Sequence, residues 1–176
     1  MTTEYLLNRE VEHVLAALTP SNRLVCEVLL HTGLRLGDVL ELRPEQLQAQ
    51  FWITEQKTGK RRRVGLPEPL RRRLQAQAGE VWVFEGANDP RKHRTRQAVY
   101  ADMKRAAKAF RLKQNVGPHS LRKVYAVELM EKYGDIERVR RALNHSSLAV
   151  TAVYAMADKL LSHKRDSKGR RYKNAR

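Results

Sequence analysis

The sequence predicts an α+β fold that is mainly helical, with one small antiparallel β-hairpin on one side. Two observations favour this class. Apolar residues recur at helical spacing along much of the 176-residue chain, whereas the segment 51–66 combines β-forming residues with a turn signal. The length suits one domain, and a hydrophobic fraction of 41% is enough to form a core.

Helices are expected ahead of this hairpin. An apolar stripe over Asn8–Leu18 predicts the first helix, with Asn8 as its candidate N-cap. Pro20 is at the first position of a second helix, which should end at Gly33, because proline suits helix starts and glycine suits helix ends. A short third helix is predicted over Leu34–Leu42.

The hairpin is expected to pair Phe51–Thr54 with Arg63–Leu66 around the Thr58-Gly59 turn, which gives it a basic tip. Three further elements are predicted before residue 111: a helix over Leu70–Ala78, a short apolar strand over Val81–Phe84 and a helix over Thr95–Phe110.

The C-terminal third is expected to be helical, after a break at Gly117-Pro118. One helix should cover His119–Lys132, with four residues facing the core: Leu121, Tyr125, Leu129 and Met130. Asp135 is placed to cap a helix that runs through Leu143, and Ser146 or Ser147 to cap the next one. We expect one domain over residues 1–158, a basic tail over 159–176, and no additional N-terminal domain in this chain.

The charge of the chain predicts a polyanionic partner. Lysine and arginine number 35 against 19 acidic residues, a formal net charge of +16, which favours nucleic acid first and an anionic membrane second. No apolar run is long enough to span a bilayer, and the one cysteine, Cys26, lies in an apolar stretch that predicts a buried reduced thiol. We therefore expect a cytoplasmic protein that is associated with the nucleoid.

A set of cationic and phenolic side chains fits phosphodiester cleavage without a metal. Guanidinium groups bind phosphate oxygens bidentately, and a covalent mechanism adds a side-chain nucleophile and a general acid. No metal-binding motif is apparent in the sequence. The candidate residues are Arg35, Lys57, His119 with Arg122 three residues later, His145, and Tyr154 nine residues after it.

At these positions the chain resembles the tyrosine recombinase, or phage integrase, family. The matching fragments are Gly33-Leu34-Arg35 with Asp38, Lys57, His119-Ser120-Leu121-Arg122, Leu143-Asn144-His145-Ser146-Ser147, and Tyr154. Each fragment alone is weakly specific, but five in the family's order are a specific signal. Asn144 stands where the family usually has glycine, and asparagine is the residue best suited to replace glycine at positive φ.

The resemblance implies a role for each residue. Tyr154 would attack the scissile phosphorus, leaving a 3′-phosphotyrosine and a free 5′-hydroxyl, while Arg35 and Arg122 stabilise the transition state. Lys57 would protonate the leaving oxygen, His145 would bond to the phosphate, and His119 would move the tyrosine proton. Asp38 would orient the guanidinium of Arg35. No cofactor, metal or ATP is implied. The partner is double-stranded DNA carrying specific recombination sites, bound by a homotetramer of a protein that is monomeric in free solution.

Several alternatives stay open from the sequence. Lys60 lies three residues from Lys57 and competes for the role of general acid. We expect Lys60, Arg61, Arg62 and Arg63 to contact the DNA backbone. A type IB topoisomerase or a telomere resolvase would use a similar site, and a non-catalytic DNA-binding relative would use the same basic surface.

Overall fold

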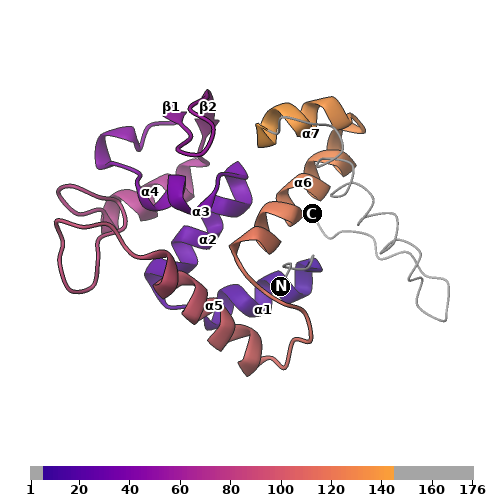
Figure 1. Cartoon of the computed structure of the whole chain (residues 1–176), viewed down its shortest axis with the longest axis horizontal. Coiled ribbons are helices and arrows are strands. Elements are labelled where there is room, and N and C mark those ends of the chain that lie inside the picture. Colours follow the sequence, from indigo (N-terminus) through magenta and orange to yellow (C-terminus); the bar gives the residue numbers. More distant parts are fainter. Residues whose placement is uncertain (1–5, 145–176) are drawn as a thin grey trace. The chain divides into compact units, whose positions relative to one another are not determined.

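The computed structural model describes residues 6–144, which Figure 1 shows as ribbon. The chain forms two compact units, Met1–Tyr125 and Ala126–Arg176, and each is described by itself. The described residues are mostly helical with one two-stranded antiparallel sheet, which confirms the predicted fold class. The elements are α1 (Asn8–Ala17), α2 (Pro20–Thr32), α3 (Leu36–Leu40), the 3-10 helix η1 (Pro44–Gln46), β1 (Gln50–Thr54), β2 (Arg61–Gly65), α4 (Glu68–Gln77), α5 (Arg96–Ala109), α6 (Pro118–Tyr133) and α7 (Ile136–Leu143).

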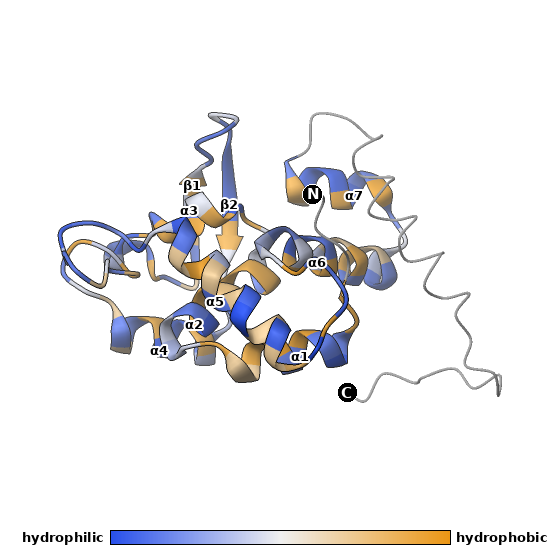
Figure 2. Cartoon of the chain, turned by 60° about the horizontal axis from the view of Figure 1, so that its bottom comes forward, coloured by the Kyte–Doolittle hydropathy of each residue, from blue (hydrophilic) through white to orange (hydrophobic). Residues whose placement is uncertain are grey.

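Helix α2 forms the centre of the first unit and contacts α1, α3 and α4. Its inward residues, among them Val25 and Val28, are fully buried, and hydrophobic and hydrophilic residues fall on different sides of the surrounding helices (Figure 2). The helix begins at Pro20 and ends at Gly33, whose φ of 60° is left-handed and whose amide donates to the carbonyl of Leu29 at 2.8 Å. Both predicted ends are therefore confirmed, and this end presents Arg35.

A buried carboxylate connects the start of α2 to α5. Asp102 accepts hydrogen bonds from the amide of Thr19 at 2.9 Å, from its hydroxyl at 2.8 Å and from the side-chain amide of Asn22 at 2.8 Å. These donors outweigh the desolvation of the carboxylate and lower the pKa of Asp102 to about 2. The bonds satisfy backbone and side-chain groups that would otherwise be orphaned at the N-terminus of α2.

The hairpin pairs β1 with β2 in an antiparallel register that places Phe51 opposite Val64 and Ile53 opposite Arg62. Phe51, Ile53 and Val64 are buried, whereas Trp52 on the other face is 55% exposed. Strand residues alternate between faces, so the hairpin has an apolar inner face and a polar outer face, and its tip is hydrophilic in Figure 2.

Three local expectations prove wrong. Val81–Phe84 is not a strand: the amide of Val83 donates to Leu42 and the carbonyl of Phe84 accepts from Arg94, so loop segments take the place of a partner strand. Leu7, not Asn8, is the N-cap of α1, and its amide donates to the Glu10 carboxylate at 2.8 Å.

The third difference concerns α6. Leu121, Val124 and Val127 are buried on this helix, whereas Tyr125, Leu129 and Met130 are half-buried. Of the four residues expected to face the core, Leu121 alone is therefore a full core residue, because the helical rotation brings residue 124 rather than residue 125 onto the buried face.

The expectations around α7 are confirmed where the structure describes them. Asp135 caps this helix by accepting from the amides of Glu137 and Arg138, and Asn144 adopts a positive φ of 53°. Ser146, Ser147 and the basic tail lie outside the described residues. Cys26 is a free, buried thiol, as expected, and burial raises its pKa. Within residues 6–144, no helix has the length and apolar character that a membrane span requires.

Candidate active site

Arg35 lies in the turn between α2 and α3, two residues after the left-handed Gly33. Its side chain is 22% exposed, and one guanidinium nitrogen donates to the carboxylate of Glu55, with which it forms an ion pair. This guanidinium makes no other hydrogen bond within residues 6–144. A guanidinium has five N–H donors, so most of Arg35 remains available to a ligand.

Two further arginines hold the backbone of this turn. Arg62 on β2 donates to the carbonyl of Thr32, and Arg122 on α6 donates to the carbonyl of Gly33. The last carbonyls of a helix have no intrahelical partner and carry partial negative charge, so cationic donors suit them. Two consecutive carbonyls at the end of α2 are thus bound by Arg62 and Arg122, which are far apart in the sequence. Arg122 is buried.

Glu55 is a fully buried acid at the end of β1. Its Oε2 accepts from Arg35 and from the hydroxyl of Thr58 at 3.2 Å, and its Oε1 lies 3.7 Å from Nη1 of Arg62. Burial lowers the pKa of Arg62, and the charge of Glu55 is among the groups that oppose this shift. A buried charge is tolerated when it is paired and hydrogen-bonded. Glu55 is paired with both arginines and is hydrogen-bonded through Oε2, whereas its buried Oε1 has no hydrogen bond among the described residues.

Lys57 lies in the turn of the hairpin, two residues after Glu55. The backbone closes this turn with a hydrogen bond from the amide of Gly59 to the carbonyl of Glu55 at 2.8 Å, and Gly59 has a φ of 65°. Both Lys57 and its competitor Lys60 are exposed.

His119 lies in an electropositive environment. Its pKa is lowered from the ordinary value of 6.5, first by partial desolvation of the imidazole and then by the positive charges of four residues: Arg122, Lys123, Arg35 and Lys57. Three of these four cations are predicted catalytic residues. Arg35, Lys57, His119 and Arg122 therefore share one electropositive cluster, which disfavours the protonated imidazole.

Asp38 is a buried acid on α3 that contacts the hairpin. Its Oδ1 accepts from the amide of Gln56 at 3.0 Å. Burial of this side chain raises its pKa. Asp38 thus joins α3 to the hairpin, while the guanidinium of Arg35 is paired with Glu55. That Asp38 helps to orient this guanidinium stays a prediction, and the two side chains interact electrostatically.

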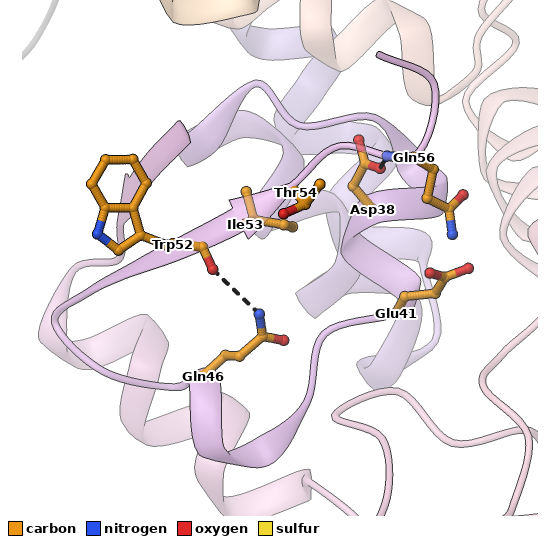
Figure 3. Close-up of a pocket in the computed structure, with 7 residues that line it drawn as sticks. All are labelled: Asp38, Glu41, Gln46, Trp52, Ile53, Thr54 and Gln56. Atoms are coloured by element: carbon orange, nitrogen blue, oxygen red, sulfur yellow. Dashed lines mark hydrogen bonds between the residues drawn. The ribbon is translucent and has the colours of Figure 1, made fainter. Parts of the chain in front are cut away.

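The pocket shown in Figure 3 includes Asp38 and Gln56, but none of the four residues of the cationic cluster lines it. Figure 3 draws the residues that line it: Asp38, Glu41, Gln46, Trp52, Ile53, Thr54 and Gln56. It holds no arginine, lysine or histidine, and two of its side chains are acids, so it does not suit a phosphate. The cationic cluster around His119 is therefore the candidate active site.

The hairpin arginines do not act as one group. Arg61 and Arg63 lie on the outer face of β2, where the guanidinium of Arg61 is 5.2 Å from the ring centroid of Trp52. Arg62 is on the inner face and is bonded to Thr32 and Glu55. Arg62 is therefore an internal residue, and the expectation that it contacts DNA beside Lys60, Arg61 and Arg63 is corrected because its guanidinium is used within the fold.

Two predicted residues, His145 and Tyr154, lie outside the described residues. Among residues 6–144, no cluster of three or more histidine, cysteine or acidic side chains is arranged to hold a metal ion.

Sequence reasoning missed Glu55 and the internal role of Arg62. The alternation that buries Phe51 and Ile53 continues to position 55, so strand periodicity already puts a carboxylate on the inner face. A charge at an inward position requires a partner, and that requirement was the signal that could have found the pair.

Comparison with known proteins agrees with the residue pattern. The model of the phage integrase family matches residues 4–174. The probable integrase/recombinase YoeC of Bacillus subtilis (strain 168) is 30% identical over 135 residues, which cover 73% of this chain and 74% of YoeC. A tyrosine recombinase of Thermosipho africanus (strain TCF52B) is 28% identical over 162 residues, which cover 86% of this chain but 56% of the relative.

Solved structures share the fold. XerA recombinase gives a TM-score of 0.72 at 20% identity and covers 92% of this chain and 64% of its own. The catalytic domain of bacteriophage HP1 integrase gives 0.67 at 20% identity and covers 97% of this chain and 100% of its own. At such identities the likeness concerns the fold alone. The family match, together with the relative at 30% identity, establishes that the chain belongs to the phage integrase family.

Proposed function

We propose that the chain is the catalytic domain of a site-specific DNA recombinase. One observation carries the proposal: cations from separate segments are joined by direct contacts, since Arg122 on α6 binds the carbonyl of Gly33, two residues before Arg35, and Arg35 pairs with Glu55, two residues before Lys57. A cluster of this kind suits a phosphodiester, because guanidinium groups pair with its non-bridging oxygens in the ground state and stabilise the added charge of the transition state. Family membership supports the same conclusion.

The proposed reaction needs Tyr154 and His145 to join this cluster. The phenolic oxygen of Tyr154 attacks the phosphorus, the bond to the 5′ oxygen breaks, and a 3′-phosphotyrosine forms. His119 accepts the phenolic proton, which its neutral form permits, and Lys57 donates a proton to the departing 5′ oxygen. Attack by a 5′-hydroxyl reverses each step and rejoins the strand, so the chemistry consumes neither ATP nor a metal ion.

The proposed partner is double-stranded DNA. Among the neighbouring structures are XerH recombinase bound to a palindromic difH substrate and a lambda integrase dimer bound to a COC′ core site. The formal charge of +16 supports a similar partner here. We further propose a cytoplasmic protein in which residues 1–158 form the catalytic domain and residues 159–176 a basic tail, and which assembles as a tetramer on two DNA sites.

Covalent capture tests the proposal. Short duplexes with a random core and a nick on one strand are incubated with the full chain, and adducts that survive denaturation are recovered and sequenced. We expect a recurrent sequence, an adduct that is lost in Tyr154→Phe, and an adduct that is retained in Tyr100→Phe, which alters a tyrosine on the surface of α5.

Two results of this experiment contradict the proposal. DNA binding without any adduct would support a non-catalytic relative. An adduct that disappears on addition of EDTA would show that the chemistry depends on a metal.

A further inference from the structure

We propose that Glu55 is a positioning residue for Arg35, an inference that rests on the proposed function. Neither the motif residues nor the family resemblance assigned a role to this position. The carboxylate of Glu55 binds the guanidinium of Arg35 from the protein side and leaves the remaining donors of that group for a DNA phosphate.

The first support is the environment of Glu55. Its side chain is fully buried, and an isolated buried carboxylate is expensive unless it is paired. Here two arginines, Arg35 and Arg62, pair with it. Arg62 donates to the carbonyl of Thr32, and its Nη1 lies 3.7 Å from Oε1 of Glu55, so the attraction of this second cation opposes movement of the carboxylate with Arg35.

The second support is the geometry of Arg35. The guanidinium contacts Glu55 through one terminal nitrogen, and its side chain is 22% exposed. A carboxylate on one edge of the planar guanidinium fixes the orientation of the opposite edge, which is the edge available for bidentate binding of phosphate. Arg35 is therefore pre-oriented before DNA arrives, which removes part of the cost of ordering a long side chain.

The third support is the link to the lysine turn. The oxygen of Glu55 that binds Arg35 also accepts from the hydroxyl of Thr58, and the carbonyl of Glu55 accepts from the amide of Gly59. Lys57 lies within the turn that these two contacts close, between Glu55 and Thr58. One buried acid thus holds both the guanidinium that would bind the phosphate and the turn that presents the general acid.

The test compares Glu55→Gln with Glu68→Gln on the captured nicked DNA. Glu68 forms an exposed ion pair with Arg72 on α4. Glu68→Gln therefore also removes one acidic partner of an arginine, but outside the cationic cluster. Single-turnover cleavage is followed in time, which separates the rate constant from the amplitude, and the dissociation constant of the DNA is measured separately. We expect Glu55→Gln to lower the rate constant roughly 10- to 100-fold, since misplacement of a catalytic group by about 1 Å costs up to about 10².

A purely structural role would change different quantities. Loss of folded protein lowers the amplitude but leaves the rate constant of the remaining molecules unchanged. A wild-type rate constant in Glu55→Gln, or an equal loss in Glu68→Gln, therefore overturns the inference. So does a rate loss that is fully explained by weaker DNA binding.

A second variant covers the case in which Glu55→Gln does not fold. Glu55→Asp keeps the negative charge between the two arginines but withdraws the carboxylate by one methylene. We expect it to fold and to cleave more slowly than the wild type at saturating DNA, and a normal rate constant contradicts the inference. If the wild-type chain forms no adduct at all, it is the proposed function that fails, so the two failures are distinguishable.

Discussion

Gly33 controls the turn that carries Arg35, and it does so through two separate constraints. Its φ of 60° is left-handed, and a Cβ at this position would overlap the ring of Tyr125. Gly59 in the hairpin turn shares the first constraint, with a φ of 65°, but has no atom within 4 Å of the added Cβ. Comparison of alanine variants at the two glycines therefore distinguishes the effect of backbone strain from that of steric overlap.

We predict that Gly59→Ala destabilises the protein by about 1–2 kcal/mol, the cost of a left-handed alanine. Gly33→Ala should cost about 1–3 kcal/mol more, because overpacking adds to the same strain. Urea unfolding of both variants measures the difference. Equal losses in the two variants would mean that the ring of Tyr125 moves aside freely.

His119 reports the electrostatics of the cluster directly. Its pKa is lowered by partial desolvation and then by nearby cations, one of which, Lys123, is outside the predicted catalytic set. We predict that Lys123→Gln raises the pKa of His119 toward 6.5, because removing a positive charge favours the imidazolium. Titration of the imidazole by NMR measures this shift.

Lys104→Gln is the control for this titration, since Lys104 is bonded to Asn115 and is not among the charges that lower the pKa of His119. The downward shift of the His119 pKa also determines how this residue makes the stability of the folded protein depend on pH. A histidine with a depressed pKa binds its proton more weakly in the folded state, so its stabilising effect is complete above pH 6.5 and is lost as the pH falls through the folded value. A downward shift in Lys123→Gln would contradict the arrangement of the cluster.

Motif order alone predicts four members of the cluster, because each lies beside a local signal. Arg35 follows a helix-ending glycine, Lys57 precedes a Thr-Gly turn, and His119 and Arg122 begin a helix after Gly117-Pro118. The pairing of Arg35 with Glu55 could not be predicted in this way. It joins residues 20 positions apart, and it depends on how the hairpin packs beside α3.

At the scale of the element, the hairpin assigns different tasks to adjacent arginines. Arg62 faces inward, where it binds the carbonyl of Thr32 and pairs with Glu55, whereas Arg61 and Arg63 face outward. We predict that Arg62→Met costs about 3–5 kcal/mol of stability, because it leaves a buried carboxylate without one partner. Arg61→Met and Arg63→Met should stay within about 0.5 kcal/mol of the wild type.

Thermal and urea unfolding of the three variants measure these differences. Because all three variants replace arginine by methionine on the same strand, they differ only in the face of the strand on which the substitution lies. Similar stability for all three variants would contradict the inward position of Arg62.

Helix ends were the most predictable features of the elements, because Pro20, Gly33 and Asp135 carry local backbone chemistry. The apolar run Val81–Phe84 was misassigned because periodicity cannot distinguish a short strand from a buried loop. Val83 and Phe84 are indeed buried, but their backbone groups bond to Leu42, two residues after α3, and to Arg94 in the segment that leads into α5. Which partner a buried segment finds is a property of the whole fold.

At the scale of the whole molecule, the number of positive charges and their positions have different consequences for binding. Composition alone predicts attraction to any polyanion. The structure adds that some cations are internal, as Arg62 and Arg122 are, while Arg61 and Arg63 stand on an exposed face beside Trp52. The net charge therefore overstates the positive charge that the surface offers to a polyanion. We expect the effect of each cation on binding to depend on its position.

We predict that DNA affinity falls steeply with salt, because log K decreases by about 0.9 for each neutralised phosphate as log salt rises. Arg61→Met should reduce this slope by about 1, as expected for a backbone contact. Arg72→Met on α4 removes the same formal charge from an exposed ion pair with Glu68 and should leave the slope unchanged. Binding measured by fluorescence anisotropy over a salt series gives all three slopes. If both variants lower the slope equally, binding follows net charge rather than the hairpin face, and a flat wild-type slope would remove the electrostatic basis for a DNA partner.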